Sequence, residues 1–467
     1  MKLTFHGAAR EVTGSCHQVE VKDANGKMRQ YLFDCGMFQG EHMCGSKNKD
    51  AFAFDPSTIE AIFVSHPHAD HTGRLAKIVS QGFTGTIYMV EPCVGLAKLV
   101  LEDAHHIMKE EAEKCGSEVL YEMEDVNRTF EQVKAVSYHE HLEVAPGIVV
   151  MFHEAGHVLG SSYISLDAPA VAPNGAMVGE EGKRLVYSGD IGNDNVPILP
   201  DTEPMSHADV VICESTYGHR EHEPIEQRSS MLRDAIQHTI HDRGVLMIPA
   251  FSIERTQELL YEIDQLLQKD LKTKIPIFLD SPMAIRATEL YRHFQNYLKF
   301  DASLIAQPDK DFFSFPNLRE TLSREESKEI NNTTPPMIII AGSGMMSGGR
   351  IMHHLRRYLP DHKNRVLIIG YQAQGTLGRK IYEGAKRVKI FGDDIPVHAQ
   401  VSAIGAFSAH GDMNKLTRWL RPEDGVIPKK IFLVHGDPEA KEVFATHLRH
   451  KLGTEVVIPE YQSSHEV

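Results

Sequence analysis

A short stretch of the sequence places three histidines and an aspartate within six positions, directly after an apolar strand. These residues are His66, His68, Asp70 and His71, in the segment SHPHADH. Such side chains would be costly to desolvate together unless a cation or a charge partner held them. Side chains alternate along an extended chain, and Pro67 keeps the backbone extended, so His66 and His68 can face one cation while Asp70 and His71 face a neighbouring one. The stretch therefore predicts a site for two metal ions.

Two metal ions need more ligands than this stretch supplies, and three other strand ends offer them. His157 follows GIVVMFHEAG, Asp190 follows KRLVYSG and His435 follows KKIFLV. Each lies beside or close to a glycine, as expected where the backbone approaches a site closely. Nitrogen and oxygen ligands favour zinc, and manganese is compatible with the same ligand types. Any one of these residues alone is also explained as a capping or buried hydrogen-bonded group, but the cluster with its partners indicates a metal site.

The hydrophobic pattern predicts the elements that position these residues. Short strands fill the first part of the chain, together with a helix over 92–114 whose apolar residues recur three and four positions apart. From about residue 219, strands alternate with long amphipathic helices, which is the pattern of βαβ units and a parallel sheet. Short strands return after about residue 396. The chain is therefore expected to be an α/β protein whose middle part is a separate domain.

Composition is that of an ordinary globular chain of 467 residues, with 42% hydrophobic and 24% charged residues. The start has no basic region followed by an apolar one, and no run of about eighteen apolar residues occurs, so we expect a cytoplasmic location and no membrane. The six cysteines form no Cys-x-x-Cys pair, which indicates reduced core residues. A net charge of −15 argues against a polyanionic ligand unless the charge is unevenly distributed.

The motifs together resemble those of the β-CASP nucleases of the metallo-β-lactamase superfamily. Besides the signature from His66 to His71, the likeness runs from residue 3 to about 440 through AAREVTGSC, LFDCGMFQG, GHVLGSS, SGDIG, ESTYGHR, PAFSIERTQE, DSPMA, GSGMMSGGR, GYQAQGTLGR, FSAHGD and LVHG. It implies an αββα sandwich with a binuclear metal site at one edge and an inserted α/β domain. The expected domains are 1–215 and 396–467 for the sandwich and 216–395 for the insertion. The motif set is most similar to that of the bacterial and archaeal homologues of the cleavage and polyadenylation endonuclease subunit.

The resemblance also implies a role for each site residue. Two Zn²⁺ per chain would be held, one by His66, His68 and His157, the other by Asp70, His71 and His435, with Asp190 between them. Asp34 would orient a ligand or the bridging solvent, although a turn-capping role before Gly36 explains it equally well. The family's additional acidic residue and histidine fall on Glu214 and His410. The catalytic group would then be His410, Glu214, Asp70 and Asp34.

Phosphodiester hydrolysis is the chemistry that this set implies. Two metals roughly 3.5–4 Å apart lower the pKa of a bridging water and stabilise an in-line displacement at phosphorus, so that hydroxide is the nucleophile. His410, kept protonated and aimed by Glu214, would donate a proton to the leaving 3′ oxygen. The expected products carry a 5′-phosphate and a 3′-hydroxyl.

Candidate phosphate contacts lie in the middle of the chain. The run GSGMMSGGR offers backbone N–H groups, and arginines stand beside Gly-rich turns. The predicted contacts are Ser343, Gly344, Ser347, Gly348, Arg350, Arg379 and, after PAFSIE, Arg255. A tight connection or an ordinary salt bridge also explains them. Between residues 341 and 390, ten Lys or Arg against two acids give a local charge of +8, which suits a polyanion guided toward a metal cleft.

The identity of residue 435 bears on the substrate. Members of the family that act on RNA resemble this chain in having histidine in LVHG, whereas DNA-acting members tend to carry valine. The resemblance therefore implies single-stranded RNA as the partner, with a homodimer expected by analogy. The alternatives are a DNA-acting nuclease, a thioester or lactam hydrolase of the same superfamily, and an inactive RNA-binding or scaffold paralogue. The hydrolase would need neither the inserted domain nor His410, and the paralogue would have lost ligands.

Overall fold

The chain divides into two compact units, as the sequence pattern predicts. The computed structural model describes residues 1–39, 47–116, 118–170, 182–222, 227–269, 271, 273–299, 311–373 and 375–467. The first unit consists of Met1–Asp194, Pro200–Glu221 and His410–Val467, and the second of Asn195–Leu199 and His222–Ala409. Because the chain leaves the first unit and returns to it, the second unit is an insertion.

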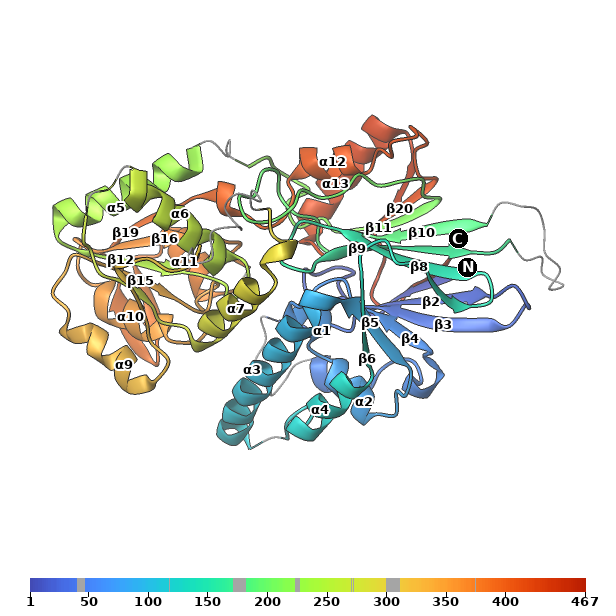
Figure 1. The fold of residues 1–467 in the computed structure, drawn as a ribbon, viewed down its shortest axis with the longest axis horizontal. Helices are drawn as coiled ribbons and strands as arrows, with labels where there is room; N and C mark the ends of the chain where they lie inside the picture. Colours follow the sequence, from blue (N-terminus) through green and yellow to red (C-terminus); the bar gives the residue numbers. More distant parts are fainter. Residues whose placement is uncertain are drawn as a thin grey trace. The chain divides into compact units, whose positions relative to one another are not determined.

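Two seven-stranded sheets form the centre of the first unit (Figure 1). The first sheet has the order β22 (Ser464–Glu466), β1 (Lys2–Phe5), β2 (His17–Lys22), β3 (Met28–Phe33), β4 (Ala61–Phe63), β5 (Thr86–Val90) and β6 (Val133–Val136). The second has the order β21 (Glu455–Val457), β20 (Lys430–Leu433), β11 (Val210–Cys213), β10 (Lys183–Tyr187), β9 (Ser162–Ala168), β8 (Ile148–Glu154) and β7 (Leu142–Ala145). Since β1 pairs with β22, the two termini lie side by side.

Aromatic side chains fill the space between the two sheets. Phe33 on β3 stacks on Tyr187 of β10 with ring centroids 5.2 Å apart, and Phe5 on β1 lies 5.1 Å from Phe432 on β20. Strands that alternate inward and outward residues place such side chains on one face, and burying them removes large apolar areas from water. This shared layer holds the sheets face to face as a sandwich.

Helices cover the outer face of each sheet. Those of the first sheet are α1 (Ala69–Thr72), α2 (Leu75–Ser80), α3 (Glu91–Cys115) and α4 (Met123–Glu131), and those of the second are α12 (Met413–Trp419) and α13 (Pro438–Leu452). The helix predicted over 92–114 is found as α3, with Ala97, Leu101 and Met108 in the core against the first sheet. On the other side, Leu416 and Phe444 pack against Val211 of β11. The four layers make the predicted αββα sandwich.

The second unit is built on a six-stranded, entirely parallel sheet. Its order is β14 (Leu318–Glu320), β13 (Ile277–Leu279), β15 (Met337–Ala341), β12 (Val245–Pro249), β16 (Arg365–Ile368) and β19 (Gln400–Ala403). Its helices are α5 (Gln227–Asp242), α6 (Arg255–Lys269), α7 (Pro282–His293), α9 (Arg324–Glu329), α10 (Ile351–Tyr358) and α11 (Leu377–Tyr382). A hairpin of β17 (Arg387–Ile390) and β18 (Asp393–Pro396) completes it. The βαβ pattern of the sequence is confirmed.

The sequence pattern predicts that the insertion ends at residue 395, because short strands return after about residue 396. In the structure, β19 pairs in parallel with β16, and the unit continues to Ala409. The pattern of a short strand does not reveal which sheet it joins, because that depends on pairing distant in sequence.

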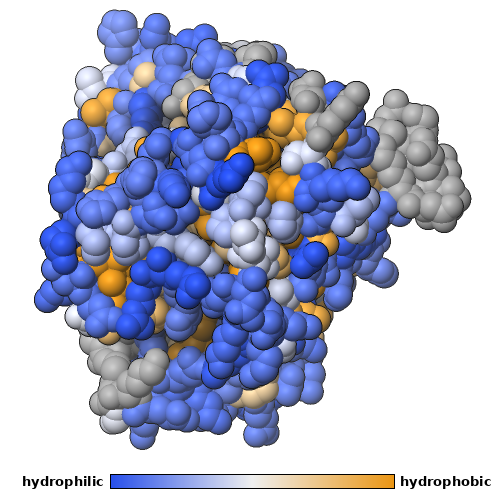
Figure 2. Space-filling model, turned by 90° about the vertical axis from the view of Figure 1, so that its left-hand side faces the viewer, coloured by the Kyte–Doolittle hydropathy of each residue, from blue (hydrophilic) through white to orange (hydrophobic). Residues whose placement is uncertain are grey.

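One face of the molecule is mostly hydrophilic, as expected for a chain with the composition of a globular protein. Figure 2 shows a face of mostly hydrophilic residues with hydrophobic residues scattered between them. Among the helices that the structure describes, none is both long and apolar enough to cross a bilayer.

The described cysteines are buried and free, as predicted for reduced core residues: Cys16, Cys35, Cys93 and Cys213. Cys44 and the side chain of Cys115 lie outside the described part of the chain.

Candidate metal centre

Residues from separate strand ends converge at one edge of the sandwich. In the second sheet, β10, β11 and β20 run parallel as neighbours, and Asp190, Glu214 and His435 follow them. In the first sheet, β3 and β4 are also parallel, and they lead to Asp34 and to the segment that begins at His66. Carboxyl ends of neighbouring parallel strands meet at the same edge, which is where open α/β sheets bind ligands.

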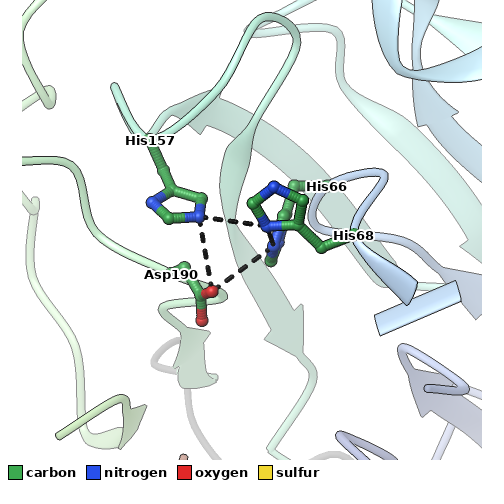
Figure 3. Close-up of side chains that lie close together, drawn as sticks. All are labelled: His66, His68, His157 and Asp190. Atoms are coloured by element: carbon green, nitrogen blue, oxygen red, sulfur yellow. Dashed lines mark hydrogen bonds and ion pairs between the residues drawn. The ribbon is translucent and has the colours of Figure 1, made fainter. Parts of the chain in front are cut away.

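Four of the predicted ligands form the first group (Figure 3). The Nε2 atoms of His66 and His157 lie 3.0 and 3.3 Å from Nδ1 of His68. The same two Nε2 atoms lie 3.4 and 3.5 Å from Oδ2 of Asp190. Two ligand atoms that bind one tetrahedral zinc ion at about 2.0–2.1 Å lie roughly 3.3 Å apart. The spacing of these four residues therefore fits one cation.

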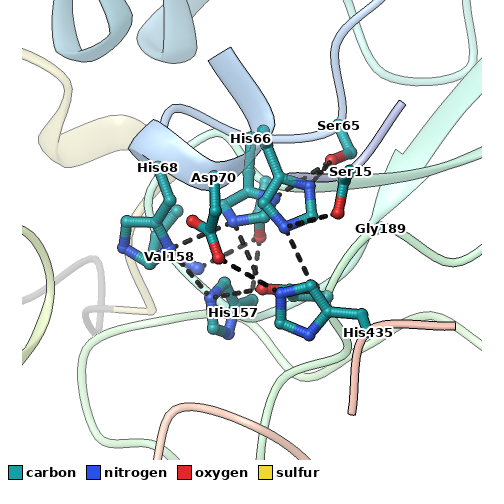
Figure 4. A network of polar contacts seen from close by, with 12 residues as sticks. Ser15, Ser65, His66, His68, Asp70, His157, Val158, Gly189 and His435 are labelled. Atoms are coloured by element: carbon teal, nitrogen blue, oxygen red, sulfur yellow. Dashed lines mark hydrogen bonds and ion pairs between the residues drawn. The ribbon is translucent and has the colours of Figure 1, made fainter. Parts of the chain in front are cut away.

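The remaining predicted ligands form a second group around the other oxygen of Asp190. Its Oδ1 lies 3.4 Å from Nε2 of His71 and 3.7 Å from Nε2 of His435, and the latter atom is 3.3 Å from Oδ2 of Asp70 (Figure 4). This Oδ1 is buried and makes no hydrogen bond in the structure. A buried carboxylate oxygen without a hydrogen bond is costly unless a cation satisfies it. Asp190 is thus placed between two groups of donors, as a residue that bridges two ions would be.

The pKa shifts of the histidines agree with a role as metal ligands. Burial and the neighbouring histidines hold the pKa of His66 well below its usual range, and burial lowers the pKa of His68 to about 3. Both imidazoles are therefore neutral, which is the form that binds metals. Burial alone would lower the pKa of His71, but Asp190 and Asp34 raise it to about 10. The excess of buried carboxylates calls for positive charge, which a proton or a metal ion supplies.

Further contacts fix the orientation of the ligands. Asp34 is fully buried, and its Oδ2 lies 2.7 Å from Nδ1 of His71, while Oγ of Ser65 and the hydroxyl of Tyr187 donate to the same oxygen at 2.7 and 2.6 Å. Oγ1 of Thr216 lies 2.9 Å from Nδ1 of His435. Such contacts leave the other ring nitrogen to face a metal and set the ring's direction. Ser65, Tyr187 and Thr216 were not among the predicted residues.

Glycines allow the backbone to approach the centre, as the sequence predicts. A Cβ atom at Gly36 would lie 1.6 Å from the carbonyl oxygen of Asp70. At Gly189, which has a φ of +51°, a Cβ atom would lie 2.6 Å from Cβ of Ser65. These positions exclude any side chain and bring the two ligand-bearing segments together.

His410 and Glu214 form a pair beside the donors. Nδ1 of His410 lies 3.2 Å from both oxygens of Glu214 and 3.9 Å from Oδ2 of Asp190. Glu214 is fully buried and accepts a hydrogen bond of 2.7 Å from the amide of Ile191. Burial lowers the pKa of His410, but Glu214 and Asp190 outweigh this effect and raise it to about 9. His410 is therefore protonated at neutral pH, and its contact with Glu214 is made through Nδ1.

The predicted phosphate contacts lie in the second unit, and the structure gives several of them other partners. Arg350 donates to Asp280 at 2.7 Å and to the carbonyls of Thr321 and Leu322. Arg379 donates to Glu383 at 2.6 Å. Within the loop, the amide of Ser347 donates to Oγ of Ser343, and a Cβ atom at Gly344 would lie 2.5 Å from the ring of Phe251. Gly348 has open space around it.

The expectation for Arg255 is corrected. Its guanidinium is buried and donates to the carboxylates of Glu254 and Glu258 and to the carbonyl of Phe407. A cation enclosed by two carboxylates has no surface left to offer a phosphate. The hydrophobic periodicity of α6 marks apolar residues as buried. It does not show that Arg255 is buried, because Arg255 and its carboxylate partners are all charged.

Comparisons with known proteins identify the class. A "Metallo-beta-lactamase superfamily domain" model matches residues 27–170, a "Beta-Casp domain" model matches 256–381, and a "Zn-dependent metallo-hydrolase RNA specificity domain" model matches 394–459. Ribonuclease TTHA0252 of Thermus thermophilus is 36% identical over 439 residues, which cover 94% of this chain and 94% of that protein. The chain belongs to the β-CASP family of the metallo-β-lactamase superfamily.

Two archaeal relatives are also similar over most of the chain. The RNase J-like protein of Methanocaldococcus jannaschii is 30% identical, with 98% of this chain and 97% of that protein covered. The transcription termination factor FttA of the same organism is 30% identical, with 98% of this chain but 70% of that protein covered.

Proposed function

We propose that the chain is a zinc-dependent ribonuclease that hydrolyses phosphodiester bonds of single-stranded RNA with two metal ions. The observation that carries the proposal is the position of Asp190, whose two oxygens face two separate groups of nitrogen and oxygen donors. Relatives named as a ribonuclease and as an RNase J-like protein, together with the RNA specificity domain model, support RNA as the substrate. Manganese fits the same donor types.

Each ion would have its own set of protein ligands, with one residue shared. His66, His68 and His157 would hold one ion, and Asp70, His71 and His435 the other, with Asp190 shared. When bound, two such ions supply Lewis acidity that lowers the pKa of water and stabilises charge on phosphate oxygens. Asp34 keeps Nε2 of His71 directed at the centre by holding Nδ1.

Proton delivery belongs to His410. The phosphorus–3′ oxygen bond breaks as a water oxygen bonds to phosphorus, and the leaving oxygen needs a proton. His410 is protonated and is held at Nδ1 by Glu214, so its charged imidazole is the group that would donate a proton to that oxygen. The products are a 3′-hydroxyl on one fragment and a 5′-phosphate on the other. Glu214 acts by keeping the imidazole charged and aimed.

The test uses zinc-loaded protein with labelled single-stranded RNA, single-stranded DNA of the same sequence and a chromogenic thioester. We expect cleavage of RNA with 5′-phosphate and 3′-hydroxyl ends, abolished in His68→Ala. Thioester turnover without RNA cleavage would instead assign the chain to the small-molecule hydrolases, and preferred cleavage of DNA would assign it to the DNA-acting nucleases. Light scattering of the same sample tests the homodimer that the family resemblance implies.

A further inference from the structure

A second group of potential metal ligands lies in the first unit, outside the centre described above. His139 precedes β7, His153 lies on the half-exposed face of β8, and Glu203 belongs to the segment that precedes β11. Their ligand atoms all lie within 4.8 Å of one another. Two neighbouring segments and a third that is distant in sequence therefore present two imidazoles and a carboxylate to the same place.

The distances from the two histidines to Glu203 lie on either side of the distance expected between two ligand atoms of one zinc ion. Nε2 of His139 lies 2.8 Å from Oε2 of Glu203, and Nδ1 of His153 lies 3.9 Å from the same oxygen. Ligand atoms of one tetrahedral zinc ion lie roughly 3.3 Å apart, so a small movement of the Glu203 side chain equalises the two distances. The separation of 3.9 Å is too long for a hydrogen bond, which leaves Nδ1 of His153 facing a carboxylate across a gap.

Neighbouring residues fix both rings in place. Nε2 of His153 lies 2.9 Å from Oγ of Ser165, and its ring stacks on Tyr163 with centroids 4.5 Å apart and planes 8° apart. When Nε2 carries the proton and donates to Ser165, Nδ1 has its lone pair toward Glu203, which is how ligand histidines are usually oriented. His139 has a φ of +62°, and its amide donates to the carbonyl of Phe152 at 2.9 Å. The turn is thus held against β8 with the imidazole beside His153.

We propose that His139, His153 and Glu203 form a further binding site for one divalent transition-metal ion, of which zinc is the best match. Two nitrogens and one carboxylate oxygen are a usual zinc donor set, and with three protein ligands a fourth position stays open to water. Side-chain exposures of 57% for His139, 34% for Glu203 and 12% for His153 give the ion a route from solvent.

A bound ion at this site would reinforce the turn that carries a ligand of the principal centre. The amide of Glu203 donates to the carbonyl of Glu154, and Oγ1 of Thr202 donates to the carbonyl of Ala155, so the segment of Glu203 lies against the turn that leads to His157. An ion that joins Glu203 to His153 fastens this segment to β8. The site would therefore act structurally and take no part in the reaction.

The test measures zinc bound per chain in the full-length protein by equilibrium dialysis at a small molar excess of zinc, followed by elemental analysis. His139→Asn removes one ligand, and asparagine tolerates the left-handed backbone at this position. Glu203→Gln removes the carboxylate, which is the charged ligand of the group, with almost no change of shape. His141→Asn is the matched control, because His141 is an exposed histidine two residues along the same segment. Addition of zinc during thermal unfolding gives a second, independent readout.

We expect His139→Asn and Glu203→Gln each to bind one zinc ion fewer than the wild type, and His141→Asn to bind as many. Zinc should also raise the melting temperature of the wild type more than that of the two variants. Only differences between proteins are compared, so the result does not depend on how many ions the principal centre holds. Equal zinc content in all four proteins would show that His139 and Glu203 form an ordinary hydrogen bond and would overturn the proposal. An equal loss in His141→Asn would overturn it as well.

Discussion

At the scale of single residues, the candidate centre depends on carboxylates that would be unfavourable without a cation. Asp34, Asp70 and Asp190 lie among buried histidines, and they raise the pKa of His71 to about 10 while burial keeps His68 neutral. Neighbouring imidazoles thus differ in charge according to the carboxylates around them. The same rule explains why His410, beside Glu214, is charged.

His410 is the residue whose removal should affect the rate and not the metal. We expect His410→Ala to lower the rate of RNA cleavage on the order of a hundred-fold or more, because the leaving oxygen loses its proton donor. Its Nδ1 lies 3.9 Å from Asp190 and contacts Glu214 more closely, so the metal content should stay at the wild-type value. Single-turnover kinetics and elemental analysis measure the two quantities. His106→Ala, which changes an exposed histidine of α3, serves as control, and unchanged kinetics in His410→Ala would remove the residue from the mechanism.

Replacement of Asp34 should instead lower the affinity for the metal ions. Asp34→Asn keeps the shape of the side chain and suits a backbone with a φ of +57°, but it removes the charge beside Nδ1 of His71. Loss of such an orienting carboxylate typically lowers metal affinity or activity by about 10–100-fold, and we expect a fall of that size in competition with a chelator. Tyr187→Phe deletes only one of the hydrogen bonds to Asp34 and should have a smaller effect. Equal affinities for the wild type and Asp34→Asn would assign Asp34 to turn formation alone.

At the scale of elements, strand ends explain which parts of the centre are predictable from the sequence. An apolar strand that ends in His or Asp beside Gly is visible as a pattern, and all seven predicted ligands lie in the two groups around Asp190. Tyr187 is not predictable in this way, because it is an inward residue of β10 whose only distinction is its proximity to Asp34. The same limit applies to Arg255, which also donates to the carbonyl of Phe407, and to β19, which pairs with β16, since neither partner is adjacent in the sequence.

Asp280 shows how an element end can be held by a buried carboxylate. It follows β13, is fully buried and accepts hydrogen bonds of 2.7 Å from Thr321, Ser327 and Arg350, with Nε2 of His354 at the same distance. Burial raises the pKa of Asp280, but the contacts with His354 and Thr321 outweigh it and hold the pKa well below its usual range. This carboxylate connects β13 and β14 to α10 in the second unit.

Replacement of Asp280 should therefore destabilise the protein in a pH-dependent way. We expect Asp280→Asn to cost about 3–5 kcal/mol at neutral pH, because Arg350 and His354 lose their buried partner. Since the folded pKa lies below the unfolded one, the stabilisation is present above pH of about 4 and is lost as pH falls further. Thermal unfolding from pH 7 to pH 3 should show the difference between the melting temperatures of the wild type and Asp280→Asn beginning to narrow below pH of about 4, with part of it left at pH 3 because the folded pKa lies lower still. A constant difference over this range would contradict the assignment.

At the scale of the whole molecule, charge distribution decides how a chain with a net charge of −15 would bind RNA. Ten basic residues between 341 and 390 suggest a strongly basic segment, but five of them pair with carboxylates in the structure: Arg350, Arg356, Arg365, Arg379 and Arg387. Four of these partners, Asp242, Asp280, Asp393 and Asp394, lie outside the segment, so the sequence count overstates its charge. Only the fold shows which acids neutralise which bases.

The salt dependence of RNA binding should reflect this pairing. Each phosphate contact on a single strand contributes a slope of about −0.7 to the logarithm of the association constant against the logarithm of salt concentration. With five of the ten basic residues already paired, we expect a slope no steeper than about −4, whereas ten contacts would give about −7. Fluorescence anisotropy of labelled single-stranded RNA with His410→Ala protein, read before the slowed cleavage proceeds, measures the slope. A slope near −7 would mean that RNA displaces the carboxylates from their arginines, and the ion pairs seen in the free protein would then open on binding.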